Sequence, residues 1–466
     1  MNNYSHRQTG RNVEFWLMMA AFYAAVFPIF IFSDSQILSS VATILVGIFT
    51  AIVIFRFPIV GFGLVINSTI LADILPKISL LSSITPLLGI ITITAYFLNK
   101  KYRESIHWNL KPVEILGLGF IFWLIISNPS ASILGSTRSW ALTFFQLWMV
   151  LWMARQFIRT QYDHQSMMII LTLGILASGI IAIQQIGSFS ALSMDNRAEG
   201  LSGGANTAAR YFLYGIIILF YLQGENKKKM VTKLIQIVCI ILLTVALFFT
   251  GSRSGILLLF VFVLLRILPA FSNQKRSAIL LIPLLAFVFI LIEQTNVNTL
   301  RFGNIIDSII NGSNTVGYRY SLWEAGYKMG MDHPIAGVGI GRFGDYLPLY
   351  WPAGRAILAN TAHNTFVEVF AETGIVGGLI FFSLLITSIL KFIKIIRTCD
   401  KPFKEIYKTW MLLIVILLIG SLTKADLIDK FLWFLLGLDF PQVNCQKLAH
   451  RSLLENAEQR LQKMLS

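Results

Sequence analysis

The residues best suited to chemistry in this chain lie in polar intervals between long apolar stretches. His363, one of six histidines, lies near the end of such an interval, just before an apolar run that begins near residue 369. A histidine that is close to arginine charges has a lowered pKa, so its imidazole stays neutral and can accept a proton from a hydroxyl. The sequence therefore favours His363 as a general base.

Polar residues also follow His363 on the helix that is expected to start there. Asn364, Glu368 and Glu372 recur every four residues, which places them on one helix face. Asn364 and Glu368 are candidates for substrate binding, and either carboxylate could orient His363 or replace it. Which of His363, Glu368 and Glu372 is the base stays open at this point.

Two arginines are the strongest candidates for binding an anion. Arg253 stands among small residues in Thr250-Gly251-Ser252-Arg253-Ser254-Gly255, and Arg319 stands between aromatic residues near the predicted start of a helix over 317–331. A guanidinium is a planar fork of donors suited to phosphate oxygens, and a helix N-terminus adds backbone N–H groups. We expect Arg253 and Arg319 to bind a diphosphate. The alternatives are a lipid-headgroup anchor for Arg253 and aromatic packing for Arg319.

Weaker candidates surround these positions. Arg197, Asn206 and Arg210 form another polar group near a glycine pair and are candidates for binding a diphosphate or glycan, as is Arg342. Arg342 lies in Gly339-Ile340-Gly341-Arg342-Phe343-Gly344, which follows no strand pattern, so a flexible loop that gates a substrate is favoured over a nucleotide site. The His and carboxylate residues show no metal-ligand spacing, so neither metal nor another cofactor is expected.

Composition places these residues in a membrane protein. The 466-residue chain is 56% hydrophobic and 13% charged, too apolar for a soluble globule. Repeated apolar runs are long enough to cross about 30 Å of hydrocarbon. The fold class expected is all-α, a polytopic integral membrane protein. The net charge of +15 is read as basic loops retained on the cytoplasmic side rather than as nucleic-acid binding.

The apolar runs predict about 12 to 14 transmembrane helices with basic loops alternating to one side. On the opposite side, called the predicted outer face, lies one long polar interval. The expected organisation is an N-terminal transmembrane bundle over 1–294, an outer loop with surface helices over 295–368, C-terminal transmembrane helices over 369–440 and an amphipathic inner tail over 441–466. The predicted spans lie near 13–32, 36–55, 57–76, 78–98, 112–128, 140–158, 166–186, 208–224, 231–250, 254–271, 277–294, 369–393, 408–424 and 427–440.

Four ordered motifs resemble the superfamily of O-antigen ligases and O-antigen polymerases. They are Gly251-Ser252-Arg253-Ser254-Gly255, Arg319 with Trp323, the segment 334–341 (PIAGVGIG), and His363-Asn364 followed by Gly374 and Gly377. The likeness covers roughly residues 190 to 440 and is somewhat closer to the ligases. Protein O-oligosaccharyltransferases and proteins once described as bicarbonate transporters share much of the pattern.

The resemblance implies a metal-independent inverting glycosyltransferase with a GT-C-like fold in the bacterial inner membrane. It would move a glycan from undecaprenyl diphosphate to an acceptor hydroxyl on the periplasmic side, with lipid A–core oligosaccharide as the expected acceptor. Arg253 and Arg319 would bind the diphosphate, and His363 would activate the hydroxyl. An O-antigen or exopolysaccharide polymerase and a small-anion transporter remain the alternatives, and the partners expected are the two glycan substrates and membrane lipids.

Overall fold

The computed structural model describes residues 36–73, 85–104, 106–127, 134–187, 197–223, 230–267, 314–352, 360–399 and 401–439. Within these ranges the chain forms helices and turns and no strand, which confirms the all-α prediction. Four of these helices are long and apolar enough to cross a membrane: Gln161–Gln185, Ala205–Gln223, Met230–Phe249 and Thr365–Thr398. The chain is therefore a multi-pass membrane protein. The spans expected over 13–32 and 277–294 and the tail over 441–466 lie outside the described residues.

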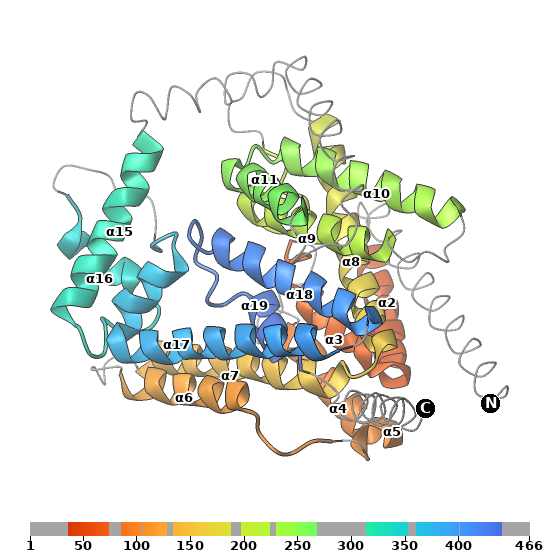
Figure 1. Cartoon of the computed structure of the whole chain (residues 1–466), viewed down its shortest axis with the longest axis horizontal. Helices are drawn as coiled ribbons and strands as arrows, with labels where there is room; N and C mark the ends of the chain where they lie inside the picture. The colour runs from red at the N-terminus through yellow and green to blue at the C-terminus, as the bar shows by residue number, and fades with distance from the viewer. Residues whose placement is uncertain are drawn as a thin grey trace, which may run out of the picture. The chain divides into compact units, whose positions relative to one another are not determined.

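The predicted apolar runs correspond to helices in most of the described chain (Figure 1). The matching elements are α2 (Gln36–Arg56), α4 (Thr85–Leu98), α6 (Pro112–Ile126), α7 (Leu134–Phe157), α8 (Gln161–Gly187), α9 (Ala205–Gln223), α10 (Met230–Phe249), α11 (Arg253–Ile267), α17 (Thr365–Thr398) and α18 (Lys401–Gly420). Two predicted spans are shorter than expected, α3 (Pro58–Asn67) and α19 (Lys430–Gly437). At 1.5 Å per residue, a helix of 8 residues reaches only about 12 Å, so α19 is too short to cross the hydrocarbon.

The chain divides into two compact units, of which the smaller holds α2, α3, α4 and the short α5 (Lys100–Arg103). There α3 packs closely against α2 and α4 because Gly61 has no side chain. A Cβ at Gly61 would lie 2.7 Å from a methyl group of Ile54 and would meet Thr92 as well. All ten residues of α3 are buried.

In the larger unit, one group of helices is formed by α6, α7, α17 and α19. Within it, α6 packs against α7 and α17, and α19 packs against α7 (Figure 1). A buried ion pair joins two of them, with Arg155 Nε 2.7 Å from Glu114 Oε1. Glu114 lies in the first turn of α6 and Arg155 in the last turn of α7, so this pair joins those two helix ends.

A second group in the same unit consists of α8, α9, α10, α11 and α18. His164 on α8 is fully buried, and its Nδ1 accepts a hydrogen bond of 3.1 Å from Trp410 Nε1 on α18. Its Nε2 lies 3.2 Å from the hydroxyl of Tyr407, which donates to the carbonyl oxygen of Asp439. Because Nδ1 accepts, Nε2 carries the proton, and His164 is a neutral structural residue that joins α8 to α18.

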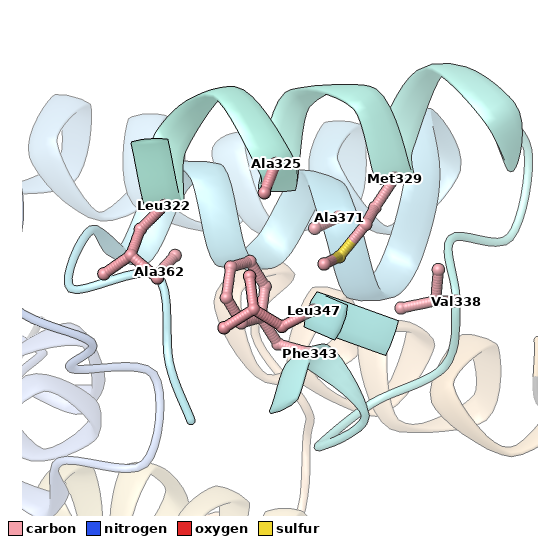
Figure 2. Packing of buried hydrophobic residues seen from close by; sticks show 8 residues of the cluster. All are labelled: Leu322, Ala325, Met329, Val338, Phe343, Leu347, Ala362 and Ala371. Atoms are coloured by element: carbon pink, nitrogen blue, oxygen red, sulfur yellow. The ribbon is translucent and has the colours of Figure 1, made fainter. Parts of the chain in front are cut away.

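The polar interval before α17 folds around a small core of its own (Figure 2). It contains α15 (Asn314–Asp332) and α16 (Phe343–Tyr350). Apolar residues of α15, α16, the connecting turns and the first turns of α17 bury one another; they are Leu322, Ala325, Met329, Val338, Phe343, Leu347, Ala362 and Ala371. The predicted helix over 317–331, ended by Pro334, is confirmed as α15, and it packs with α16 and the start of α17 around this core.

A break at Gly374 divides α17 into a short initial part and a long apolar part. Gly374 has φ 65° and ψ −166°, a backbone conformation that is essentially restricted to glycine. The chain that follows α15 packs against α17 at this break. Ile375 N donates a hydrogen bond of 2.8 Å to Pro334 O, and Val338 N donates one of 2.9 Å to Ala371 O. The initial part of α17 is thereby fixed to the segment that follows α15, while the remainder continues as an apolar helix.

Candidate functional site

His363 lies in a tight turn that is fixed on both sides. Ala362 is buried in the core of Figure 2, and its N–H donates 3.1 Å to Glu368 Oε2. Asn364 caps α17 by accepting from Phe366 N at 3.0 Å and from Val367 N at 3.3 Å. His363 itself has φ 49°, a left-handed conformation that is uncommon for a residue with a Cβ. The contacts of its two neighbours thus fix the backbone of His363 in this uncommon conformation.

The two carboxylates that were candidates for the base are engaged by backbone groups. Glu372 is buried, and its oxygens accept from Gly341 N at 2.9 Å and Phe343 N at 3.0 Å. Glu368 accepts from Ala362, as described above. Both side chains therefore shape the loops around His363.

These contacts also revise the expectation for the glycine-rich segment 339–344. The N–H groups of Gly341 and Phe343 are directed to Glu372 rather than to a ligand, and Gly339 N donates 3.0 Å to Glu372 O. The segment is anchored to α17, so the predicted flexible gate does not fit this arrangement. Arg342 lies over the ring of Tyr346, 4.7 Å from its centre, and is directed toward α16.

Arg319 is brought close to His363 from α15. Burial lowers the pKa of the Arg319 guanidinium, and the nearby charge of Arg253 lowers it further. Burial likewise lowers the pKa of His363, and the positive charges of Arg319 and Lys424 lower it further. The predicted electrostatic effect on His363 is therefore present, with Lys424 as an additional source.

The helix positions of the two arginines differ from the prediction. Because α15 begins at Asn314, Arg319 lies beyond the first turn, so the expected N-terminal N–H donors beside it are absent from that position. Residues 314–316 continue the helix toward the N-terminus. Arg253 instead is the first residue of α11, where the positive end of the helix dipole adds to its own charge. Its side chain is exposed, as a ligand would require.

Arg197 and Asn206 join two of the turns near Arg253. Arg197 Nε donates 2.8 Å to Thr250 O, and a terminal nitrogen of the same guanidinium donates 2.9 Å to Asn206 Oδ1. The turn before α9 is thereby fixed to the turn before α11. These contacts give both residues a supporting role close to Arg253.

Arg210 is buried in an ion pair that the sequence did not reveal. Its Nη1 lies 2.6 Å from Asp426 Oδ2, and its other terminal nitrogen contacts Oδ1 of the same carboxylate. Only 2% of Arg210 is exposed, so the side chain is closed to substrate. The predicted binding role does not fit this position, and the contacts assign Arg210 to joining α9 with the loop before α19.

The segment 421–429 places Lys424 beside the histidine. Thr365, two residues after His363, donates through its hydroxyl 2.8 Å to Lys424 O, and its N–H donates 2.9 Å to Ser421 O. Lys424 Nζ donates 2.9 Å to Thr207 Oγ1 at the start of α9. Segments far apart in the sequence thus converge near His363. The contribution of the segment 421–429 was not predicted from the sequence.

We call Arg253, Arg319, His363 and Lys424 the cationic site. It combines a neutral imidazole with three basic side chains supplied by different elements. Imidazole can take a proton from a hydroxyl, and guanidinium groups can stabilise negative charge on phosphate oxygens. The described residues contain no group of three or more His, Cys, Asp or Glu side chains placed to hold a metal ion.

Comparison with known proteins finds a family match for part of the chain. Residues 238–382 match a family model described as O-antigen ligase, which confirms the predicted relationship to that superfamily. The matched segment contains Arg253, Arg319 and His363, whereas Lys424 lies beyond it. The match supports activity of the ligase and polymerase type, a membrane glycosyltransferase acting on glycan and lipid substrates. No curated protein matches the chain significantly.

Proposed function

Because residues 238–382 match a family model described as O-antigen ligase, we propose that the chain transfers a glycan from undecaprenyl diphosphate to an acceptor hydroxyl. The acceptor we favour is lipid A–core oligosaccharide, which makes the reaction O-antigen ligation. The reaction takes place at the periplasmic face of the inner membrane. The observation that carries the proposal is the cationic site, in which a histidine suited to act as base lies within the field of Arg319.

In the proposed reaction, His363 accepts the proton of the acceptor hydroxyl as its oxygen forms a bond with the anomeric carbon of the glycan. The bond from that carbon to the diphosphate oxygen breaks, and the diphosphate leaves with the bonding electrons. Arg253 and Arg319 stabilise the charge that develops on the leaving group. Attack from the side opposite the diphosphate inverts the anomeric configuration. This chemistry requires no metal ion as a participant.

The test is transfer by the purified full-length protein from a polyprenyl-diphosphate glycan to lipid A–core, with a chelator present. We expect product from the wild type and a loss of about 100- to 10,000-fold in His363→Ala, the range for removing a general base. Insertion into membranes and helix content should be unchanged, because His363 is not part of the buried core. Full activity of a folded His363→Ala protein would contradict the mechanism.

A second candidate is polymerisation, in which the acceptor is itself a lipid-linked repeat, because the same family match and cationic site serve it equally. Replacing lipid A–core by undecaprenyl-diphosphate-linked repeats separates the two. Elongated lipid-linked glycan without transfer to lipid A–core would identify a polymerase. Uptake of a small anion into liposomes by both wild type and His363→Ala would instead favour transport.

A further inference from the structure

Lys424 occupies an unusual position for a lysine in a membrane protein. It lies in the turn between α18 and α19, on the predicted outer face, where the positive-inside rule leads us to expect few basic residues. Its backbone is fixed to α17 through Thr365, two residues from His363. The side chain is 29% exposed, so it is partly open to solvent.

The ammonium group of Lys424 contacts Thr207 and Asp426. An ammonium group has three donors, and the hydroxyl of Thr207 accepts one of them at 2.9 Å. Asp426 Oδ1 lies 3.7 Å away, too far for a hydrogen bond. Within the described residues, Thr207 is thus the close hydrogen-bond acceptor of this ammonium group, and Asp426 is its longer ion-pair partner.

Neighbouring acidic groups are already engaged by other partners. Both oxygens of Asp426 contact Arg210, and Oδ2 also accepts from Ser421 Oγ at 2.9 Å. Asp429 caps α19 by accepting from Phe431 N, and it accepts from the hydroxyl of Tyr211. Lys424 therefore shares Asp426 with Arg210 through a longer ion pair of 3.7 Å, and its positive charge still lowers the pKa of His363.

We propose that Lys424 is a further substrate-binding residue, which binds a phosphate group of one of the two substrates beside Arg253 and Arg319. This inference rests on the proposed function. A lysine binds phosphate as a compact point charge, which complements the directional forks of the two arginines. The phosphate belongs either to the diphosphate of the donor or to a phosphorylated acceptor. Thr207 holds the ammonium in place from α9.

The experiment measures KM separately for donor and acceptor in wild type, Lys424→Met and Lys424→Arg. Loss of one charge-assisted hydrogen bond is expected to raise KM for one substrate by about tenfold in Lys424→Met, with recovery in Lys424→Arg. A rise for the donor assigns the diphosphate, and a rise for the acceptor assigns the acceptor phosphate. Lys328→Met is the matched control, since Lys328 is an exposed lysine on α15 paired with Glu324.

A second readout tests whether the charge of Lys424 acts on His363 in the working enzyme. Removing the positive charge of Lys424 raises the pKa of His363, so the acid limb of the kcat/KM profile should move to higher pH in Lys424→Met and return in Lys424→Arg. The charged groups that act on this pair are Arg319, Arg210, Asp426 and Asp429. Both KM values within twofold of wild type, together with an unmoved acid limb in folded Lys424→Met, would overturn the proposal.

Direct binding separates this inference from the proposed function. Undecaprenyl diphosphate and lipid A–core are titrated into the detergent-solubilised wild type and Lys424→Met by calorimetry, without turnover. If the wild type transfers no glycan, the proposed function fails, while a tenfold rise in Kd for either probe still supports Lys424 as a phosphate ligand. Equal Kd values for both probes in the two proteins would refute it.

Discussion

The turn at His363 concentrates several constraints on one residue. Its left-handed backbone lies between a buried Ala362 and the helix cap Asn364. The carboxylate of Glu368 on α17 accepts a hydrogen bond from Ala362 N. A residue held this way keeps its orientation before a substrate arrives, so less ordering is left for the reaction step. The pKa shift at this residue gives the first prediction.

Activity should persist to lower pH than an ordinary histidine permits. Burial and the charges of Arg319 and Lys424 lower the pKa of His363, so its neutral, proton-accepting form predominates at pH 7. As pH falls through this lowered pKa, the imidazole becomes protonated and kcat/KM decreases. We expect the acid limb of the kcat/KM profile to lie below the usual histidine pKa of about 6.5. An acid limb above that value would be inconsistent with this environment.

Arg253→Lys tests the fork geometry rather than the charge. Lysine keeps the positive charge at the start of α11 but cannot bind two phosphate oxygens in parallel. We expect transfer to fall by about 10- to 100-fold, measured as kcat/KM for the donor. Arg397→Lys on an exposed part of α17 is the control and should be neutral. Wild-type rates in Arg253→Lys would make Arg253 a membrane anchor instead.

Residue types alone predicted His363, Arg253 and Arg319, because few ionisable side chains interrupt the apolar chain. The same reasoning assigned Arg210 to substrate, since a sequence cannot show that a carboxylate 216 residues away takes both terminal nitrogens. Lys424 carried a usable signal, a basic residue in a predicted outer loop. Its position near His363 depends on the hydrogen bond from the Thr365 hydroxyl to Lys424 O, and a sequence cannot show this contact.

At the scale of the element, α17 joins the cationic site to the membrane-spanning bundle. Its initial part carries Asn364 and Glu368, and the part after Gly374 is apolar. Hydrophobic periodicity predicted this helix and α15 well, because both signals are local. Periodicity could not predict the break, whose cause is the close approach of the backbone at Ile335.

Gly374→Ala should destabilise the protein strongly. Alanine disfavours φ 65° with ψ −166°, and its Cβ would collide with the backbone of Ile335 and Ala336. The strain alone costs about 1–3 kcal/mol, which lowers the apparent Tm in detergent, and transfer activity should fall with it. Gly378→Ala on the same helix is the control, because nothing lies within 4 Å of its added Cβ. Equal Tm values for the two variants would contradict the role given to the break.

At the scale of the molecule, long-range polar contacts connect the outer turns of the larger unit. Arg197 fixes the turn before α9 to the turn before α11, and Lys424 connects α9 with the loop before α19. Composition predicted a multi-pass helical membrane protein because apolar content is a property of the whole chain. The order in which helices pair was not predictable, since apolar faces are chemically alike and the decisive contacts are single polar pairs.

The Arg210–Asp426 pair should contribute to stability rather than to substrate affinity. Removing one partner leaves a buried charge uncompensated, which costs about 3–5 kcal/mol. We expect Arg210→Met and Asp426→Asn each to lower the free energy of unfolding by about that amount, and the double variant to lose less than the sum. Chemical unfolding in detergent measures this cycle. A stable Arg210→Met protein with a raised donor KM would restore the binding role predicted from sequence.

The same ion pair can form only late in synthesis, because its two partners are 216 residues apart. Arg210 on α9 enters the membrane long before Asp426 has been translated, so its counter-ion arrives only with the segment before α19. Thr365 likewise waits for that segment before its hydroxyl can bind Lys424 O. The cationic site is therefore completed late, and a ribosome-bound chain that ends before this segment is an inserted but inactive intermediate.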